Sequence, residues 1–234
     1  MFYFDVTYLI FIIPCVVISL ICQVRVKTAF SKYSAIPNSR GMTGAQAAEY
    51  VLRQNGVTGV SIERVAGKLT DHYDPRTNVI RLSKSVYASA SVAAVGVAAH
   101  EAGHAVQTAQ NYLPNKIRSA ILPAARIGSG FSWILIIIGF MFAYRVTSPV
   151  GLYVLYAGII LFSATVLFTV ATLPVEFDAS RRALKCIRET NLLSQDEYKG
   201  VKSVLSAAAM TYVASALTSI MQLLRLIFLA NRRR

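Results

Sequence analysis

Long uncharged stretches alternate along this chain with segments that mix apolar and charged residues. Residues 6–24 contain no charged side chain, and neither do residues 127–144, 146–175 and 203–224. About 20 predominantly apolar residues are enough for a helix to cross a bilayer. We therefore predict a transmembrane anchor at residues 6–24 and a transmembrane hairpin at residues 127–173, which together make about three transmembrane helices.

The last uncharged stretch is given a different interpretation. Residues 203–224 contain Ser, Thr and Gln repeatedly. A span there would also place Arg232, Arg233 and Arg234 outside the cell, against the usual excess of basic residues on the cytoplasmic side. We expect a helix that packs on the folded domain and on the membrane surface.

Between the first two apolar stretches, the pattern changes to that of a folded domain. Thr43 with Gln46 has the spacing of a capping box, so a helix is expected to begin there and to end near Asn55. Weak alternation at residues 60–65 and 78–82 predicts short strands, with residues 68–72 pairing back on the first. The fold class that follows is a mainly helical α+β integral membrane protein with a small antiparallel sheet.

The charge distribution refines this picture. The formal net charge of +13 could indicate a nucleic-acid partner, but the basic residues flank apolar runs instead of gathering on one domain. Arg25 and Lys27 directly follow the first span, and Arg181 and Arg182 follow the third. This distribution predicts the lipid bilayer as a partner and no nucleic acid. It places residues 25–126 on the cytoplasmic side of a multi-pass protein of the plasma membrane.

The segment His100-Glu-Ala-Gly-His104 holds the candidate chemistry. Side chains four apart on a helix share one face, so the imidazoles of His100 and His104 would converge on one point. Glu101 is turned by about 100° from His100, which puts its carboxylate beside that point. Two neutral imidazoles and a nearby carboxylate are what a hydrolase with a bound Zn²⁺ and an activated water needs.

The alternative interpretation is a pair of histidines in an ordinary helix core. The chain has three histidines, and two of them lie in this motif. The surrounding run is mostly Ala and Val, where two imidazoles and a carboxylate would be costly to bury without partners or a metal. The pattern therefore favours a metal site.

A catalytic zinc site of this kind has three protein ligands, so one ligand lies elsewhere in the chain. The candidates include His72, Glu176 and Asp178. The two acids lie two residues apart, so on a helix only one of them can face the ion. Asp178 can form an i,i+4 ion pair with Arg182, whereas Glu176 lies on the face expected to pack inward. We predict Glu176 as the third ligand.

Three motifs carry a resemblance to a known family: Asp71-His-Tyr-Asp-Pro-Arg76, His100-Glu-Ala-Gly-His-Ala-Val-Gln107 and Pro174-Val-Glu-Phe-Asp-Ala-Ser180. Together they resemble the bacterial YugP-like neutral zinc metallopeptidases. They are more distantly similar to the membrane heat-shock protease and CAAX prenyl protease class. The resemblance implies a zincin-like, membrane-bound gluzincin. In the membrane heat-shock protease class an aspartate follows the ligand glutamate by four residues, whereas this chain has Ser180 at that position.

The predicted function is that of a membrane-bound zinc endopeptidase acting on protein or peptide substrates, including membrane proteins, with Glu101 as general base. The predicted layout is an anchor at 6–24, a catalytic segment at 25–126, a transmembrane hairpin at 127–173, and helices at 174–234 that complete the catalytic domain. His72 is a candidate hydrogen-bond donor to the oxyanion that forms on the substrate during hydrolysis. Residues 78–82 are a candidate rim of the substrate cleft or an ordinary edge strand. The oligomeric state is not predicted. The alternatives are an intramembrane protease of the site-2 type and a membrane scaffold with a structural or vestigial metal site.

Overall fold

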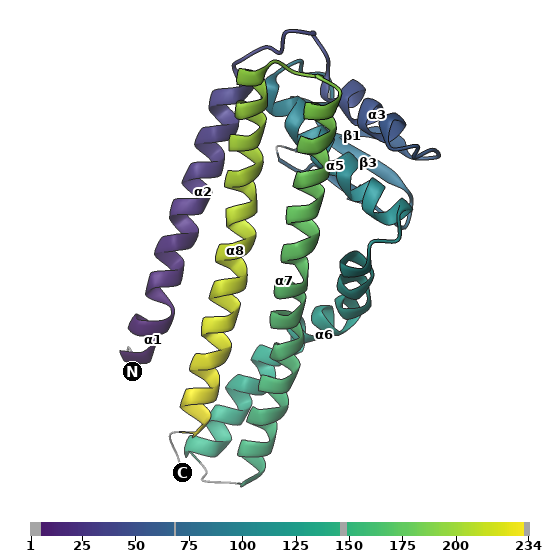
Figure 1. The fold of residues 1–234 in the computed structure, drawn as a ribbon. Coiled ribbons are helices and arrows are strands. Elements are labelled where there is room, and N and C mark those ends of the chain that lie inside the picture. Colours follow the sequence, from purple (N-terminus) through teal and green to yellow (C-terminus); the bar gives the residue numbers. More distant parts are fainter. Residues whose placement is uncertain (1–5, 68, 146–148, 232–234) are drawn as a thin grey trace. The chain divides into compact units, whose positions relative to one another are not determined.

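The computed structural model describes residues 6–67, 69–145 and 149–231 (Figure 1). The helices and strands follow in chain order: α1 (Val6–Phe11), α2 (Ile13–Ser34), α3 (Gly44–Gln54), β1 (Ser61–Val65), β2 (His72–Asp74), β3 (Val79–Ser83), α4 (Lys84–Tyr87), α5 (Val92–Ala109), α6 (Leu113–Arg145), α7 (Pro149–Glu189) and α8 (Gln195–Asn231). The protein is mainly helical with a small sheet, as the sequence predicts. Contacts between residues divide the chain into two units.

Four helical segments of the described residues are long and apolar enough to cross a membrane: Val6–Ser34, Leu113–Ala143, Pro149–Glu189 and Gln195–Asn231. The expectation of three spans was therefore wrong. The Ser and Thr residues of α8 misled it, because their hydroxyls bond back to carbonyls of their own helix. Thr218 donates to the carbonyl of Ala214 at 2.8 Å and Ser219 to that of Ala216 at 2.9 Å. Such back-bonded hydroxyls need no water, so they do not prevent a span.

Unit 1 contains the described residues up to 21, then 116–173, and those from 212 onward. Within it, α6 and α7 pack closely through glycines. A Cβ added at Gly139 would lie 2.5 Å from the backbone nitrogen of Leu155, and one at Gly158 would lie 2.9 Å from that of Ile136. Small residues that let two helix backbones approach are the usual means of packing helices in a membrane. This supports the predicted helical hairpin.

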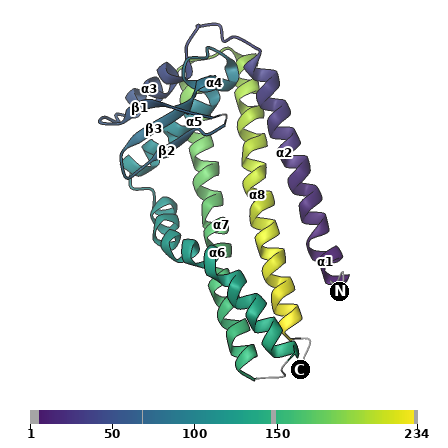
Figure 2. The same ribbon diagram turned by 180° about the vertical axis from the view of Figure 1, so that it is seen from behind.

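Unit 2 comprises residues 22–115 and 174–211. Its core lies around α5, whose alanines Ala94, Ala98 and Ala102 are at most 1% exposed. The helix α3 packs along α5, and the sheet and α4 also contact it (Figure 2). Because α5 carries mostly small side chains, neighbouring elements come close to its backbone. The motif helix is thus held rigidly from several sides.

The sheet is mixed, with the strand order β1–β3–β2, so the predicted antiparallel sheet was wrong. β1 runs parallel to β3, and β2 runs antiparallel to it. β2 pairs with β3 because the turn between them is tight and well bonded. In that turn Asn78 has a left-handed φ of 55° and accepts a hydrogen bond from the Tyr73 hydroxyl at 2.7 Å. β3 is therefore the central strand, and residues 78–82 form neither a free edge nor a cleft rim.

The helix ends follow their sequence signals. Thr43 and Gln46 form the expected capping box of α3. Ser91 caps α5 by accepting a hydrogen bond from the backbone nitrogen of Ala94. The helix α7 is continuous through Pro174. Because of this continuity, Glu176 lies on the same helix as the uncharged run that precedes it, but within unit 2.

Candidate metal centre

The helix α5 places His100 and His104 one turn apart on one face. Their ring centroids are 4.7 Å apart and the ring planes meet at 82°. Between them, Gly103 allows α7 to approach. A Cβ added at Gly103 would lie only 2.6 Å from the carbonyl oxygen of Ala179. No larger side chain fits there without moving the two helices apart, so this glycine sets the distance between α5 and α7.

That approach brings a carboxylate from α7 to the two imidazoles. Oε2 of Glu176 lies 3.4 Å from Nε2 of His100 and 3.5 Å from Nε2 of His104. Ligand atoms of these three residues all lie within 4.8 Å of one another. Glu176 is buried, at 4% exposed, whereas the side chains of His100 and His104 are each 13% exposed.

The spacing of these atoms fits a metal ion better than a set of hydrogen bonds. Donor atoms about 2.0–2.2 Å from a tetrahedral zinc ion lie about 3.4 Å apart. The two measured separations, 3.4 and 3.5 Å, agree with that value. They exceed the usual length of an N–H···O hydrogen bond, about 2.7–3.2 Å. Two imidazoles and one carboxylate are also a donor set that zinc prefers.

Glu101 lies on the same helix but is not part of this donor group. Its side chain follows His100 by one residue and is therefore turned about 100° around the helix. It is buried, with 8% of its surface exposed. A carboxylate beside the donor group, but outside it, is available for proton transfer.

Electrostatics within the group favour a bound cation. Burial lowers the pKa of the His104 imidazole, but its contact with Glu176 and the negative charge of Glu101 raise that pKa above its ordinary value. The carboxylate of Glu176 supplies a negative charge at this point, and both imidazoles face it. A metal ion at this point would face the Glu176 carboxylate and would compete with a proton for the His104 imidazole.

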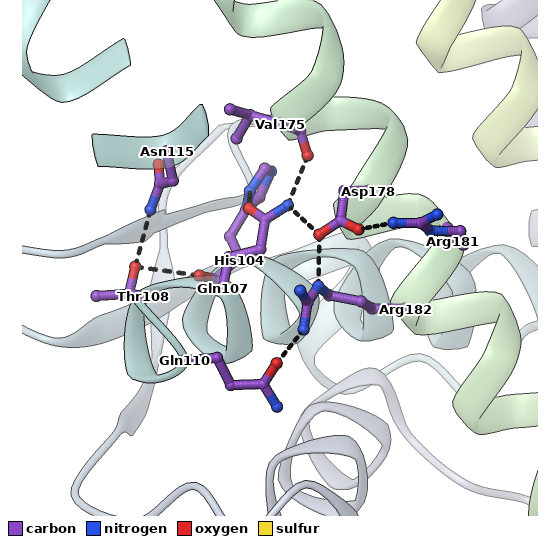
Figure 3. A network of polar contacts seen from close by, with 9 residues as sticks. All are labelled: His104, Gln107, Thr108, Gln110, Asn115, Val175, Asp178, Arg181 and Arg182. Carbon is purple, nitrogen blue, oxygen red and sulfur yellow. Dashed lines mark hydrogen bonds and ion pairs between the residues drawn. The ribbon is translucent and has the colours of Figure 1, made fainter. Parts of the chain in front are cut away.

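Each imidazole is also held on its other side. Nδ1 of His100 lies 3.1 Å from the hydroxyl of Ser180. Nδ1 of His104 lies 3.1 Å from Oε1 of Gln107, and both of these residues are drawn in Figure 3. The importance of Gln107 was not seen in the sequence. Its position three residues after His104, one helical turn on, is the signal that could have found it.

The two other candidate ligands lie elsewhere. Asp178 contacts Arg181 and Arg182, as its i,i+4 spacing to Arg182 predicts. His72 is on β2, exposed, with Nδ1 2.8 Å from the carbonyl oxygen of Thr70. Its role as an oxyanion donor stays a prediction.

The class of protein follows from comparison with known families. Residues 8–231 match the family described as "Putative neutral zinc metallopeptidase". The chain therefore belongs to the neutral zinc metallopeptidase family, which confirms the YugP-like resemblance seen in the sequence. It is 45% identical over 212 residues to the "Putative membrane protease YugP" of Bacillus subtilis (strain 168), a match that covers 90% of this chain and 91% of that protein. No solved structure matches the chain.

These comparisons settle the coarse description of the protein. The family indicates Zn²⁺ as the cofactor, and the described residues contain a His–His–Glu group that can hold it. The relative named as a membrane protease and the four apolar helices support a location in the membrane. Together they support a protease that acts on protein or peptide substrates.

Proposed function

We propose that this protein is a membrane-bound endopeptidase in which His100, His104 and Glu176 bind Zn²⁺ and Glu101 is the general base. The observation that carries the proposal is the convergence of three ligand atoms within 4.8 Å of one another, with Oε2 of Glu176 at 3.4 and 3.5 Å from the two imidazoles, in a chain of a zinc metallopeptidase family. The gluzincin arrangement, with a glutamate from a later helix as third ligand, is part of the same proposal.

The residues of the site have separate tasks. Zinc, when bound, supplies a Lewis acid that lowers the pKa of a water molecule and polarises a peptide carbonyl. His100, His104 and Glu176 would hold the ion. Glu101 accepts a proton from the attacking water and passes it to the leaving amine. The contact of α5 with α7 at Gly103 keeps the ligands from the two helices at a fixed separation.

The alternative functions are less well supported. An intramembrane site-2-type protease would need α5 in the bilayer, and α5 is not among the four described helices that are long and apolar enough. A scaffold with a structural metal site would not need Glu101 next to the donor group. The presence of this buried carboxylate therefore favours hydrolysis.

Removal of zinc is expected to abolish proteolysis by protein purified in detergent. In the proposed site the metal ion is the group that polarises the peptide carbonyl, and His100, His104 and Glu176 only hold it. Cleavage should therefore stop after chelation and return when one equivalent of Zn²⁺ is added. Metal content and the release of fragments from an unfolded protein such as casein measure the two quantities on one sample. Full activity in protein shown to be free of metal would contradict the proposed function.

We also propose that unit 2 faces the cytoplasm, because Arg25, Lys27 and the basic residues after Glu176 flank the spans on that side. A cysteine at Ser39 is then expected to be protected from an impermeant thiol reagent in intact cells. A cysteine at Ser148, which lies outside the described residues, or at Asn231 should be labelled. With four spans, both of these positions are on the outer side.

The labelling experiment uses a chain in which the natural cysteines Cys15, Cys22 and Cys186 are replaced, all of which are buried. Opening the cells with detergent should make the Ser39 position reactive, which shows that protection comes from the membrane. Labelling of Ser39→Cys in intact cells to the same extent as Ser148→Cys would overturn the orientation.

A further inference from the structure

Gln107 is a fully buried amide with three polar partners. Its side chain is 0% exposed, on the face of α5 that meets α7. Its Nε2 donates to the carbonyl oxygen of Val175 at 2.8 Å and to Oδ2 of Asp178 at 2.9 Å. Its Oε1 lies 3.1 Å from Nδ1 of His104. Figure 3 shows Gln107 between the imidazole and the carboxylate.

These partners decide which way the amide points. The carbonyl of Val175 and the carboxylate of Asp178 can only accept hydrogen bonds, so the NH₂ group of Gln107 must face them. Both hydrogens of that group are then used, and Oε1 must face His104. An oxygen in this position accepts a hydrogen bond from a protonated Nδ1. Nδ1 of His104 is therefore held protonated, which leaves Nε2, the nitrogen that faces Glu176, as the one that can bind a metal ion.

Asp178 is itself held firmly. Its side chain is 3% exposed, with Arg181 bonded to one carboxylate oxygen and Arg182 to the other. Arg182 also donates to Oε1 of Gln110, the residue that follows the end of α5. The carboxylate therefore connects α7 to α5 next to the ligands without being a ligand. The amide of Gln107 is braced by a charged group that has little freedom to move.

We propose that Gln107 is a positioning residue for the metal: it selects the tautomer of His104 and aims Nε2 at the ion, with Asp178 and its two arginines fixing the amide. This inference rests on the proposed role of His104 as a zinc ligand. A metal-binding imidazole commonly donates its other N–H to an acceptor, and loss of such a partner lowers metal affinity about 10–100-fold.

The second imidazole has a partner of a different kind. Ser180, 3.1 Å from Nδ1 of His100, carries a hydroxyl that can donate or accept a hydrogen bond. A hydroxyl therefore does not select a tautomer, whereas the braced amide of Gln107 does. Ser180→Ala is expected to weaken zinc binding less than Gln107→Met.

The first measurement is the zinc Kd, obtained by competition with a chelator on the full chain in detergent. Gln107→Met keeps the length and removes both the acceptor and the donor, so its Kd should rise about 10–100-fold. The matched control is Asn38→Leu. Asn38 is another buried amide of unit 2, which donates to the carbonyls of Met42 and Ala90. This variant should lower Tm and leave the Kd unchanged.

The second measurement is the nitrogen NMR spectrum of histidine in zinc-loaded protein. The chain has three histidines, so replacing His72 leaves the signals of His100 and His104. Ser180→Ala, which changes the partner of His100 alone, then tells these two apart. In the wild type, Nδ1 of His104 should be protonated and hydrogen-bonded. In Gln107→Met that resonance should shift and its proton should exchange faster with water, whereas Asn38→Leu should leave it in place. A purely structural brace would not move this signal.

The outcomes separate the two proposals. Wild-type protein that binds no zinc overturns the proposed function, and this inference with it. Zinc-binding wild type with an unchanged Kd in Gln107→Met, or with His104 bound through Nδ1, overturns this inference alone. If Gln107→Met does not fold, Asp178→Asn is measured in its place. The new asparagine still offers an oxygen that can accept a hydrogen bond from Gln107, but it lacks the negative charge that pairs with Arg181 and Arg182. Its Kd should rise by a smaller factor, and an unchanged Kd and resonance would overturn the inference.

Discussion

Replacement of Glu101 by glutamine is expected to abolish proteolysis and to leave zinc bound. The amide has nearly the same shape as the carboxylate but cannot accept a proton from water. A positioned acid–base group contributes about 10²–10⁴-fold to a rate, so kcat should fall by at least that factor. Because the ligand atoms belong to His100, His104 and Glu176, zinc content should stay at one equivalent. Both quantities are measured on the same purified sample.

Glu49→Gln is the matched control for this change. Glu49 lies on α3 in the same unit and is exposed, so the same chemical change there should alter neither activity nor zinc content. Retention of wild-type activity by Glu101→Gln would rule out Glu101 as the base. Loss of zinc together with activity would instead make Glu101 a part of the metal site.

Glu176→Gln should lose both zinc and activity. The substitution removes the negative charge that faces the two imidazoles at 3.4 and 3.5 Å and leaves a neutral, weaker donor. A catalytic site with only two imidazoles as strong ligands no longer has the three protein ligands that zinc requires. Zinc stoichiometry after dialysis against metal-free buffer measures the loss directly, without dependence on activity.

Asp178→Asn is the comparison for the third ligand. Asp178 is two residues away, equally buried and also anionic, but its oxygens contact Arg181, Arg182 and Gln107 instead of the donor group. Its substitution should weaken zinc binding partially. Full zinc in Glu176→Gln together with empty Asp178→Asn would reverse the assignment of the third ligand.

Much of the helical structure could be predicted because its signals are local. A capping box such as Thr43 with Gln46 depends on residues within one turn, so it is visible in the sequence and present in the structure. The ion pair of Asp178 with Arg182 is local in the same sense, since α7 places the two residues one turn apart. The convergence of His100 and His104 follows from the same spacing.

Features that depend on partners far away in the chain were predicted less well. The pairing of β1 with β3 follows from which strands meet in space, and alternation within each strand does not contain that information. The span count failed for a different reason, which is local. Ser and Thr count as polar in a hydropathy pattern, but in α8 their hydroxyls are satisfied by the carbonyls of the preceding turn.

The sequence by itself determined that two imidazoles and a carboxylate share one helix, because a fixed rise and turn per residue place them there whatever surrounds the helix. Only the tertiary structure decided the rest of the site. The distance of Glu176 from those imidazoles depends on how closely α7 can approach Gly103. The orientation of Gln107 depends on the Val175 carbonyl and the Asp178 carboxylate, both on α7. Such contacts join residues about 70 positions apart, and only packing brings them together.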